Sequence, residues 1–133
     1  MPVDHVIINS NDYKRAADFY SWLMPKIGYS QTMSVPEPTP TTGWYGAGGS
    51  FWLRPSDAEF RGDRFHRHRV GLCEVAFAAE NRGQIDQLAK EIESHGGKIL
   101  DPPKEYDYVP GYYAVFFSDP DGLKLELVNV PRG

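Results

Sequence analysis

The feature that most constrains this sequence is an internal repeat, because two halves of similar length present the same order of elements. Each half predicts a strand, a capped helix that stops at glycine, and then three more strands. The registers agree: His5 precedes Gly28 by 23 positions, and Glu74 precedes Gly96 by 22. Since neither βαβββ unit can bury its sheet alone, the repeat predicts an α+β fold in which two paired units form a curved eight-stranded mixed sheet around a cavity, with the helices outside.

The first half contains a strand at 3–8 and then a helix. Asp12 belongs to a polar run suited to cap the helix, and Gly28 ends it. Short strands are expected at 44–47 and 50–53. Five apolar residues recur at helical spacing and form one stripe that must cover a sheet, namely Ala16, Phe19, Tyr20, Leu23 and Ile27.

The second half contains a strand at 69–79, in which alternation places Cys73 toward the helix as an inert core thiol. Asn81 and Gln84 resemble a capping box at the start of the second helix. A short strand at 98–100 and a loop at 101–110 are expected to follow.

The stretch 112–128 predicts a β-hairpin. Its centre, Asp-Pro-Asp-Gly at 119–122, has Pro at the second turn position and Gly at the fourth. In the second arm the leucines at 123, 125 and 127 point to one face, and Glu126 points to the other. A carboxylate in this position is either solvated on an outer face or directed into a cavity, where it holds a ligand.

The repeat pairs four positions that carry reactive or bulky side chains. His5 aligns with Glu74 on the first strands, and Trp52 aligns with Glu126 on the last strands. Each is followed by an apolar residue that would face the helices. Because side chains alternate along a strand, all four are predicted to face the cavity.

Several motifs together resemble the vicinal oxygen chelate superfamily, which includes glyoxalase I, fosfomycin and bleomycin resistance proteins, and extradiol dioxygenases. They are His5 at the first strand, DFYSWLMPKIG from Asp18, GLCEVAF from Gly71 and FFSDPDGLKLEL from Phe116. The resemblance covers nearly the whole chain. It implies a single glyoxalase-like domain over 1–133, with module 1 at 1–56, a linker at 57–68 and module 2 at 69–131.

The resemblance also implies a set of metal ligands. His5 matches the first ligand position of the family and Glu126 the last, while Glu74 stands where these proteins usually place a histidine. Trp52 stands where glyoxalase I has a ligating glutamate, and a tryptophan cannot bind a metal. One imidazole and two carboxylates would suit a divalent cation such as Zn²⁺, Mn²⁺, Fe²⁺ or Ni²⁺ and would leave open positions for a substrate.

The function implied is that of a metal-dependent enzyme of lyase, isomerase or dioxygenase type that chelates a small oxygenated substrate. Glu126 or Glu74 is expected to act as general base. Four aromatic residues are expected to form walls of the substrate pocket: Trp52, Trp44, Tyr106 and Tyr113. The alternative is a metal-free protein of the bleomycin-resistance type that binds a drug or metabolite, and Trp52 at a ligand position favours it.

Other roles for these residues stay open at this point. Glu74 could instead form an ion pair with Arg69 or Lys124 in a site that binds no metal. His66 and His68 lie in a basic run, where they could bind metal, belong to a solvated linker or border the cavity.

Composition narrows the class of protein and its partners. The chain is 41% hydrophobic with a mean hydropathy of -0.49, and it lacks the ~20-residue apolar run of a membrane span. The start resembles no signal peptide, and one cysteine excludes an internal disulfide, so a cytoplasmic location is expected. A net charge of -4 with scattered signs argues against nucleic acid. We expect a small-molecule ligand, and the resemblance also admits a homodimer.

Overall fold

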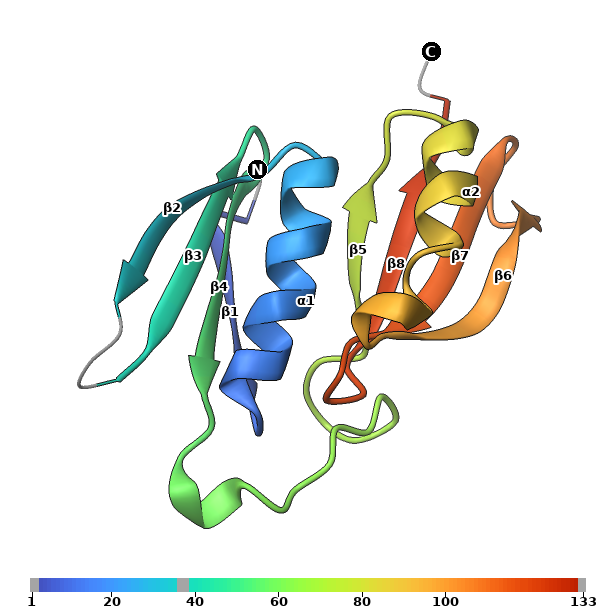
Figure 1. Cartoon of the computed structure of the whole chain (residues 1–133). Coiled ribbons are helices and arrows are strands. Elements are labelled where there is room, and N and C mark those ends of the chain that lie inside the picture. The colour runs from blue at the N-terminus through green and yellow to red at the C-terminus, as the bar shows by residue number, and fades with distance from the viewer. Residues whose placement is uncertain (1–2, 36–38, 132–133) are drawn as a thin grey trace. The chain divides into compact units, whose positions relative to one another are not determined.

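The structure, a computed structural model, describes residues 3–35 and 39–131. The chain divides into two compact units, Met1–Arg64 and Phe65–Gly133, and each is described by itself. The boundary falls within the linker predicted at 57–68. Each unit contains one four-stranded mixed sheet and one α-helix that packs against it (Figure 1).

The first unit has the elements β1 (His5–Ser10), α1 (Tyr13–Lys26), β2 (Ser30–Val35), β3 (Thr41–Gly46), β4 (Gly49–Pro55) and the short 3-10 helix η1 (Ala58–Phe60). Its strand order is β1-β4-β3-β2. Only the β1–β4 pair is parallel, which is the pairing that a crossover through α1 requires.

The second unit repeats this plan with β5 (Val75–Ala78), α2 (Arg82–Ala89), the 3-10 helix η2 (Glu93–His95), β6 (Lys98–Tyr106), β7 (Tyr112–Ser118) and β8 (Lys124–Asn129). Its strand order is β5-β8-β7-β6, and again only the first pair is parallel. The predicted α+β fold with two βαβββ modules is therefore confirmed, and its eight strands form two four-stranded sheets.

Both helix starts use the side chains that the sequence predicts. The Asp12 carboxylate accepts a hydrogen bond of 3.2 Å from the Arg15 amide, and the Asn81 side chain accepts one of 2.8 Å from the Gln84 amide. The Gln84 side chain in turn accepts a bond of 2.8 Å from the Glu80 amide. These bonds satisfy amide donors that a helix leaves unpaired in its first turn.

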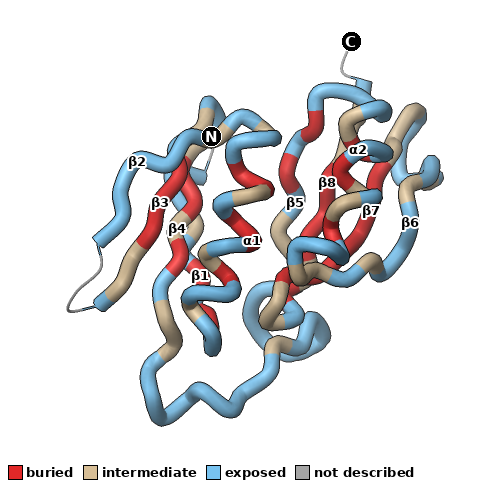
Figure 2. The backbone as a smooth tube through the Cα atoms, viewed as in Figure 1, coloured by how far each residue is buried: buried red, intermediate tan, exposed pale blue. Residues whose placement is uncertain are grey.

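The core of each unit lies between its helix and its sheet, where the buried stretches of the central strands face the helix (Figure 2). In the second unit the leucine face of β8 is buried as predicted, with Leu125 and Leu127 fully inaccessible. Other core residues of the two units are Phe19, Tyr20, Leu23, Phe51, Leu53, Ile85, Leu88, Val115 and Phe117.

The predicted hairpin joins β7 to β8. The Gly122 amide donates to the Asp119 carbonyl at 2.9 Å, and Gly122 adopts the positive φ of 91° that the turn requires. The buried Asp119 carboxylate accepts bonds of 2.9 Å from the amides of Asp121 and Leu123. The turn fixes the register of β8, and with it the face on which Glu126 lies.

Two predicted strand boundaries are wrong. The strand expected at 69–79 is only Val75–Ala78, because β5 pairs with β8 alone and β8 begins at Lys124, so the preceding residues have no strand beside them. Gly71 adopts a φ of 122° in this irregular stretch. As a result Cys73, predicted as a core thiol, is exposed.

The loop expected at 101–110 is largely strand, because β6 continues to Tyr106 through Pro102 and Pro103. β6 is an edge strand, and its register with β7 shifts on both sides of Asp101. Prolines are compatible with edges and bulges, since no ladder hydrogen bond needs their missing amide hydrogen.

Gly49 gives a test of the turn between β3 and β4. It has a φ of 131°, and an added Cβ would lie 2.6 Å from the Asp4 carbonyl oxygen. We expect Gly49→Ala to lower the free energy of unfolding by roughly 2–4 kcal/mol in urea denaturation. Gly48→Ala is the matched control, because a Cβ there meets nothing within 4 Å. Equal stability of the two variants would contradict this account.

Candidate functional site

The strand registers confirm the equivalence predicted from the repeat. Trp52 of β4 pairs with Ile7 of β1, and Glu126 of β8 pairs with Ala76 of β5. His5 lies two residues before Ile7, as Glu74 lies two residues before Ala76. Each unit thus presents its own pair of candidate residues on the sheet face opposite its helix.

Glu126 is the most enclosed of the three predicted metal ligands. Its side chain is buried, with an exposed fraction of 3%, so the solvated alternative is excluded. The Tyr112 hydroxyl of β7 donates a hydrogen bond to Glu126 Oε2. Phe116, which pairs with Glu126 across the hairpin, lies on the same face. The carboxylate is therefore held by its neighbour strand and shielded by aromatic rings.

Glu74 lies just before β5 and forms an ion pair with Lys124, with 3.4 Å between Oε1 and Nζ. This confirms Lys124 as the partner in the ion-pair alternative for Glu74. The Lys124 ammonium also lies 4.7 Å from the centroid of the Phe116 ring. The second unit thus gathers two carboxylates, one ammonium and one phenol on the face of its sheet that is opposite α2.

The pKa of Glu126 is raised from 4.5 to about 7. Burial is the main cause, and the hydrogen bond and charge of Glu74 act in the same direction, while Tyr112 and Lys124 oppose them. A carboxyl group with a pKa near neutrality can both accept and return a proton, as general acid–base catalysis requires.

Two tyrosines border this carboxylate. Burial and the hydrogen bond to Glu126 raise the pKa of Tyr112, so its hydroxyl stays protonated and serves as a donor. Tyr106 packs edge-on against Tyr112 and Phe116, with ring centroids 6.4 and 5.3 Å away. Its hydroxyl is buried and has no hydrogen-bond partner among the described residues. Tyr106 therefore lies beside the site, where its hydroxyl could donate to a bound molecule.

Tyr113 was predicted as a pocket wall, and this is wrong. Its hydroxyl donates to Asp86 of α2 at 2.5 Å, and the Arg82 guanidinium lies 4.8 Å from its ring centroid. Tyr113 therefore faces the helix, and its neighbour Tyr112 faces the site. Alternation back from Phe116, the hairpin partner of Glu126, was the signal that could have identified Tyr112.

His5 and Trp52 lie on the face of the first sheet that is opposite α1. His5 is exposed, and its Nδ1 lies 2.7 Å from a carboxylate oxygen of Asp4, which would orient the ring and leave Nε2 accessible. The Trp52 indole covers Gly43 and donates to the Ser50 hydroxyl at 2.8 Å.

Trp44, the other predicted wall residue of this unit, belongs to the core. It is fully buried, and its ring contacts Tyr20 of α1 and Phe51, with centroids 6.2 and 6.5 Å apart. It pairs with Phe51 across β3 and β4, so it shares the helix-facing side with that residue and not the side of Trp52. The prediction for Trp44 is therefore wrong.

The donor chemistry of the predicted metal ligands fits a divalent cation, since carboxylate oxygens and an imidazole nitrogen are common ligands. Within the described residues, however, no three His, Cys, Asp or Glu side chains lie together in a group that could hold a metal ion. In the second unit Glu74 and Glu126 supply two donors, and Lys124 competes for one of them.

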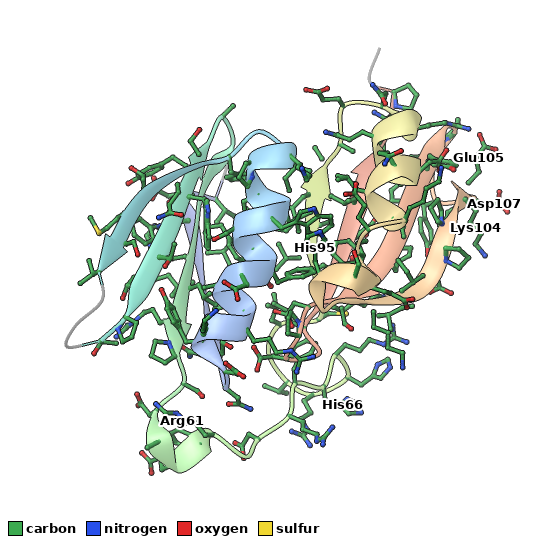
Figure 3. All side chains as sticks on the ribbon, in the orientation of Figure 1. Arg61, His66, His95, Lys104, Glu105 and Asp107 are labelled. Carbon is green, nitrogen blue, oxygen red and sulfur yellow. The ribbon has the colours of Figure 1, made fainter. Side chains whose placement is uncertain are left out.

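The Arg82–Glu105 ion pair at the outer edge of the second unit does not belong to this site. Lys104, Glu105 and Asp107 project from β6 and the turn after it (Figure 3). Glu105 pairs with Arg82 at 2.5 Å, and both side chains are largely solvated. Such exposed pairs contribute roughly 0–1 kcal/mol to stability, which is the ordinary role of surface charge.

Comparison with known proteins identifies the family. Residues 26–127 match the model of the Glyoxalase/Bleomycin resistance protein/Dioxygenase superfamily, and the chain belongs to this superfamily. It is 30% identical over 127 residues to the uncharacterized protein YqjT of Bacillus subtilis (strain 168), covering 93% of this chain and 95% of that protein.

Solved structures agree with the fold. A candidate glyoxalase from Bacillus halodurans is 28% identical with a TM-score of 0.80, over 96% of this chain and 95% of that one. A glyoxalase/bleomycin resistance protein/dioxygenase domain from Frankia sp. EAN1pec has a TM-score of 0.79 at 22% identity, over 98% of both chains, and shows likeness of fold alone.

None of the helices in the described residues has the length and apolarity to cross a membrane.

The raised pKa of Glu126 predicts a pH-dependent stability. The folded chain keeps the proton up to about pH 7 and the unfolded chain loses it near 4.5, so the free energy of unfolding falls as the pH rises through this window. Glu126→Gln removes this loss. In urea denaturation, the free energy of unfolding of the variant minus that of wild type should be about 3 kcal/mol larger at pH 8 than at pH 4. The exposed Glu80→Gln should show no such change, and a Glu126→Gln difference independent of pH would refute the assignment.

Tyr112 gives an independent test of the same site. Its hydrogen bond lowers the pKa of Glu126, so Tyr112→Phe should raise that pKa above its wild-type value. A ¹³C NMR titration of the Glu126 carboxyl measures the change directly. Tyr113→Phe is the matched control, because that hydroxyl binds Asp86. An unchanged or lower pKa in Tyr112→Phe would mean that the hydrogen bond does not act as described.

Proposed function

We propose that this chain is an enzyme of lyase, isomerase or dioxygenase type that moves a proton on a small oxygenated substrate, with Glu126 as the acid–base group. The observation that carries this proposal is the buried carboxylate of Glu126, hydrogen-bonded by Tyr112 beside the Glu74–Lys124 ion pair. Its pKa near 7 supports the same role.

The neighbouring groups divide the work of such a site. Lys124 pairs with Glu74, and Glu126, whose pKa is raised to about 7, is the carboxyl that exchanges its proton near neutral pH. Tyr112 orients the Glu126 carboxylate. The Tyr106 hydroxyl, which has no partner within the described part of the chain, is suited to donate to a substrate oxygen.

We further propose that Glu74 and Glu126, the two predicted ligands of the second unit, bind a divalent cation such as Zn²⁺, Mn²⁺, Fe²⁺ or Ni²⁺. When bound, such an ion would act as a Lewis acid toward substrate oxygens. For Glu126 to serve as a ligand it must lose its proton, and Glu74 must exchange Lys124 for the ion. Metal affinity should therefore increase with pH. The family resemblance also gives His5 a ligand role, which stays a prediction, and its Nδ1 contact with Asp4 leaves Nε2 accessible.

A metal-free binding protein of the bleomycin-resistance type is the second candidate. It is favoured by the Trp52 indole, which is half-buried and meets the exposed Tyr45 ring edge-on at 6.0 Å. Such a pair of rings offers a surface on which an aromatic ligand could stack. The predicted cytoplasmic location, the homodimer and the single-domain organisation stay predictions.

Metal content separates the two candidates. We expect protein purified without chelator to carry a divalent metal by elemental analysis, and Glu126→Ala to lose it because this substitution removes a ligand. His5→Ala tests the ligand role that the family resemblance gives to His5. Glu80→Ala, which removes an exposed carboxylate, should retain the metal. If wild type and both variants hold no metal, even after dialysis against each of the four ions, the metal-dependent proposal fails. Quenching of tryptophan fluorescence by an aromatic ligand, unaffected by chelator, would then support the binding protein.

A further inference from the structure

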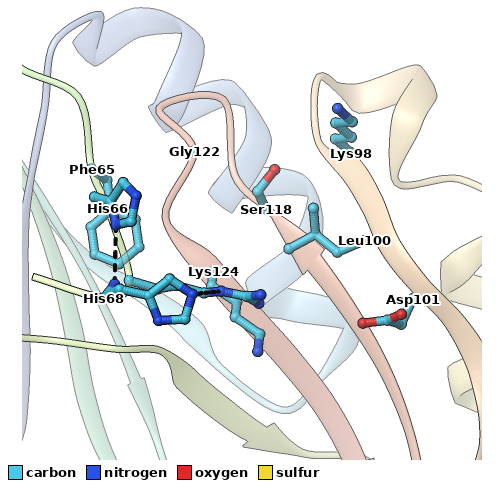
Figure 4. A pocket seen from close by; sticks show the side chains of 10 residues that line it. Phe65, His66, His68, Lys98, Leu100, Asp101, Ser118, Gly122 and Lys124 are labelled. Carbon is cyan, nitrogen blue, oxygen red and sulfur yellow. Dashed lines mark hydrogen bonds between the residues drawn. The ribbon is translucent and has the colours of Figure 1, made fainter.

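A second feature of the Phe65–Gly133 unit lies at one end of its sheet, beside the segment 65–74 that precedes β5 and is called the connector below. An open cavity of about 720 Å³ lies here (Figure 4). It is lined by the connector, by the start of β6, by the last residue of β7 and by the start of β8, and its residues are Phe65, His66, Arg67, His68, Lys98, Leu100, Asp101, Ser118, Gly122 and Lys124.

The lining of this cavity is strongly basic. Arg67, Lys98 and Lys124 contribute three positive charges, and Asp101 contributes the one carboxylate. Lys124 shares its charge with Glu74. Lys98 forms no ion pair within the described residues, so its ammonium is available to a ligand. In a chain whose net charge is -4, this local excess of positive charge is opposite in sign to the whole.

The connector side chains are arranged as donors. The His68 amide donates to Nδ1 of His66 at 3.2 Å, and Nε of Arg67 donates to Nε2 of His68 at 3.2 Å (Figure 4). Because these ring nitrogens accept, the proton of each neutral imidazole is on its other nitrogen, Nε2 of His66 and Nδ1 of His68. The two terminal nitrogens of Arg67 make no hydrogen bond with any described residue.

We propose that this cavity binds the anionic group, a phosphate or a carboxylate, of the enzyme's substrate. Oxyanions are recognised by guanidinium and ammonium groups together with neutral N–H and O–H donors, and the lining supplies all of these, including the Ser118 hydroxyl. With Lys124 paired to Glu74, Arg67 and Lys98 still outweigh the single lining carboxylate of Asp101, so the cavity favours an anion over a cation.

The position of Lys124 connects this cavity to the acid–base site and deepens the proposed function, on which it rests. Lys124 lies two residues before Glu126 on the same face of β8, which is about 7 Å along a strand. A substrate whose anionic group contacts Lys124 would therefore place an atom about 7 Å away beside the Glu126 carboxyl. This distance selects small, extended, anionic molecules as the substrate class.

Binding of inorganic phosphate to the chelator-treated 133-residue chain tests the proposal, measured by ¹H–¹⁵N NMR at constant ionic strength. We expect saturable shifts of the Leu100, Ser118 and Gly122 amides. The double substitution Arg67→Gln, Lys98→Gln should weaken binding about tenfold or more, because it removes two cations whose charge-assisted hydrogen bonds an anion would accept. Lys90→Gln, an exposed lysine beside a separate hollow at α2, should leave the affinity unchanged.

Acetate provides the second arm, since it distinguishes a carboxylate from a phosphate ligand. Saturation by either anion, lost in the double variant, supports the cavity. Shifts that stay linear in anion concentration, or that are equal in the double variant and wild type while both spectra are folded, overturn it. The anion titration is done without metal, so its outcome is independent of the metal measurement. Phosphate binding by Glu126→Gln would support the cavity even if the acid–base proposal were wrong.

Discussion

The hydrogen bond from Tyr112 to the buried Glu126 carboxylate is the contact on which the chemistry of the second unit depends. An ionisable group on a sheet is normally solvated, and burying it without partners would cost several kcal/mol. Here the hairpin turn at 119–122 sets the register that places phenol and carboxyl together. The tight turn and the buried leucine face therefore fix the backbone of β8, and this backbone positions Glu126 on the opposite face of the sheet.

The duplicated fold gives a common frame, but its two copies carry different chemistry. Equivalent positions hold His5 and Glu74, and likewise Trp52 and Glu126, as the strand registers show. In the first unit the Trp52 indole N–H donates a hydrogen bond to the Ser50 hydroxyl, which is a contact between two neutral groups. In the second unit the corresponding position is a titrating acid. The proposed acid–base function therefore depends on one copy, while the other presents an imidazole and an aromatic surface.

The features that could be predicted from the sequence are those that depend on residues close to one another along the chain. The helix caps, the hairpin turn and the alternation around Glu126 are local, and the structure confirms them. The ends of β5 and β6 were missed because strand length depends on the partner strand, which no local pattern contains. Aromatic character alone does not determine which face of a strand Tyr113 and Trp44 occupy, whereas alternation counted from a residue on a known face does.

Lys124 joins the two features of the second unit, because it pairs with Glu74 and also lines the basic cavity. An anion bound in that cavity would compete with Glu74 for the ammonium group. Glu74 would then have less compensation for its charge, and the repulsion between it and Glu126 would increase. Since Glu74 already raises the pKa of Glu126, this loss would raise it further and favour the protonated acid. Occupancy of the cavity and the protonation of Glu126 would therefore be linked through one side chain, and the direction of that linkage follows from the signs of the charges alone.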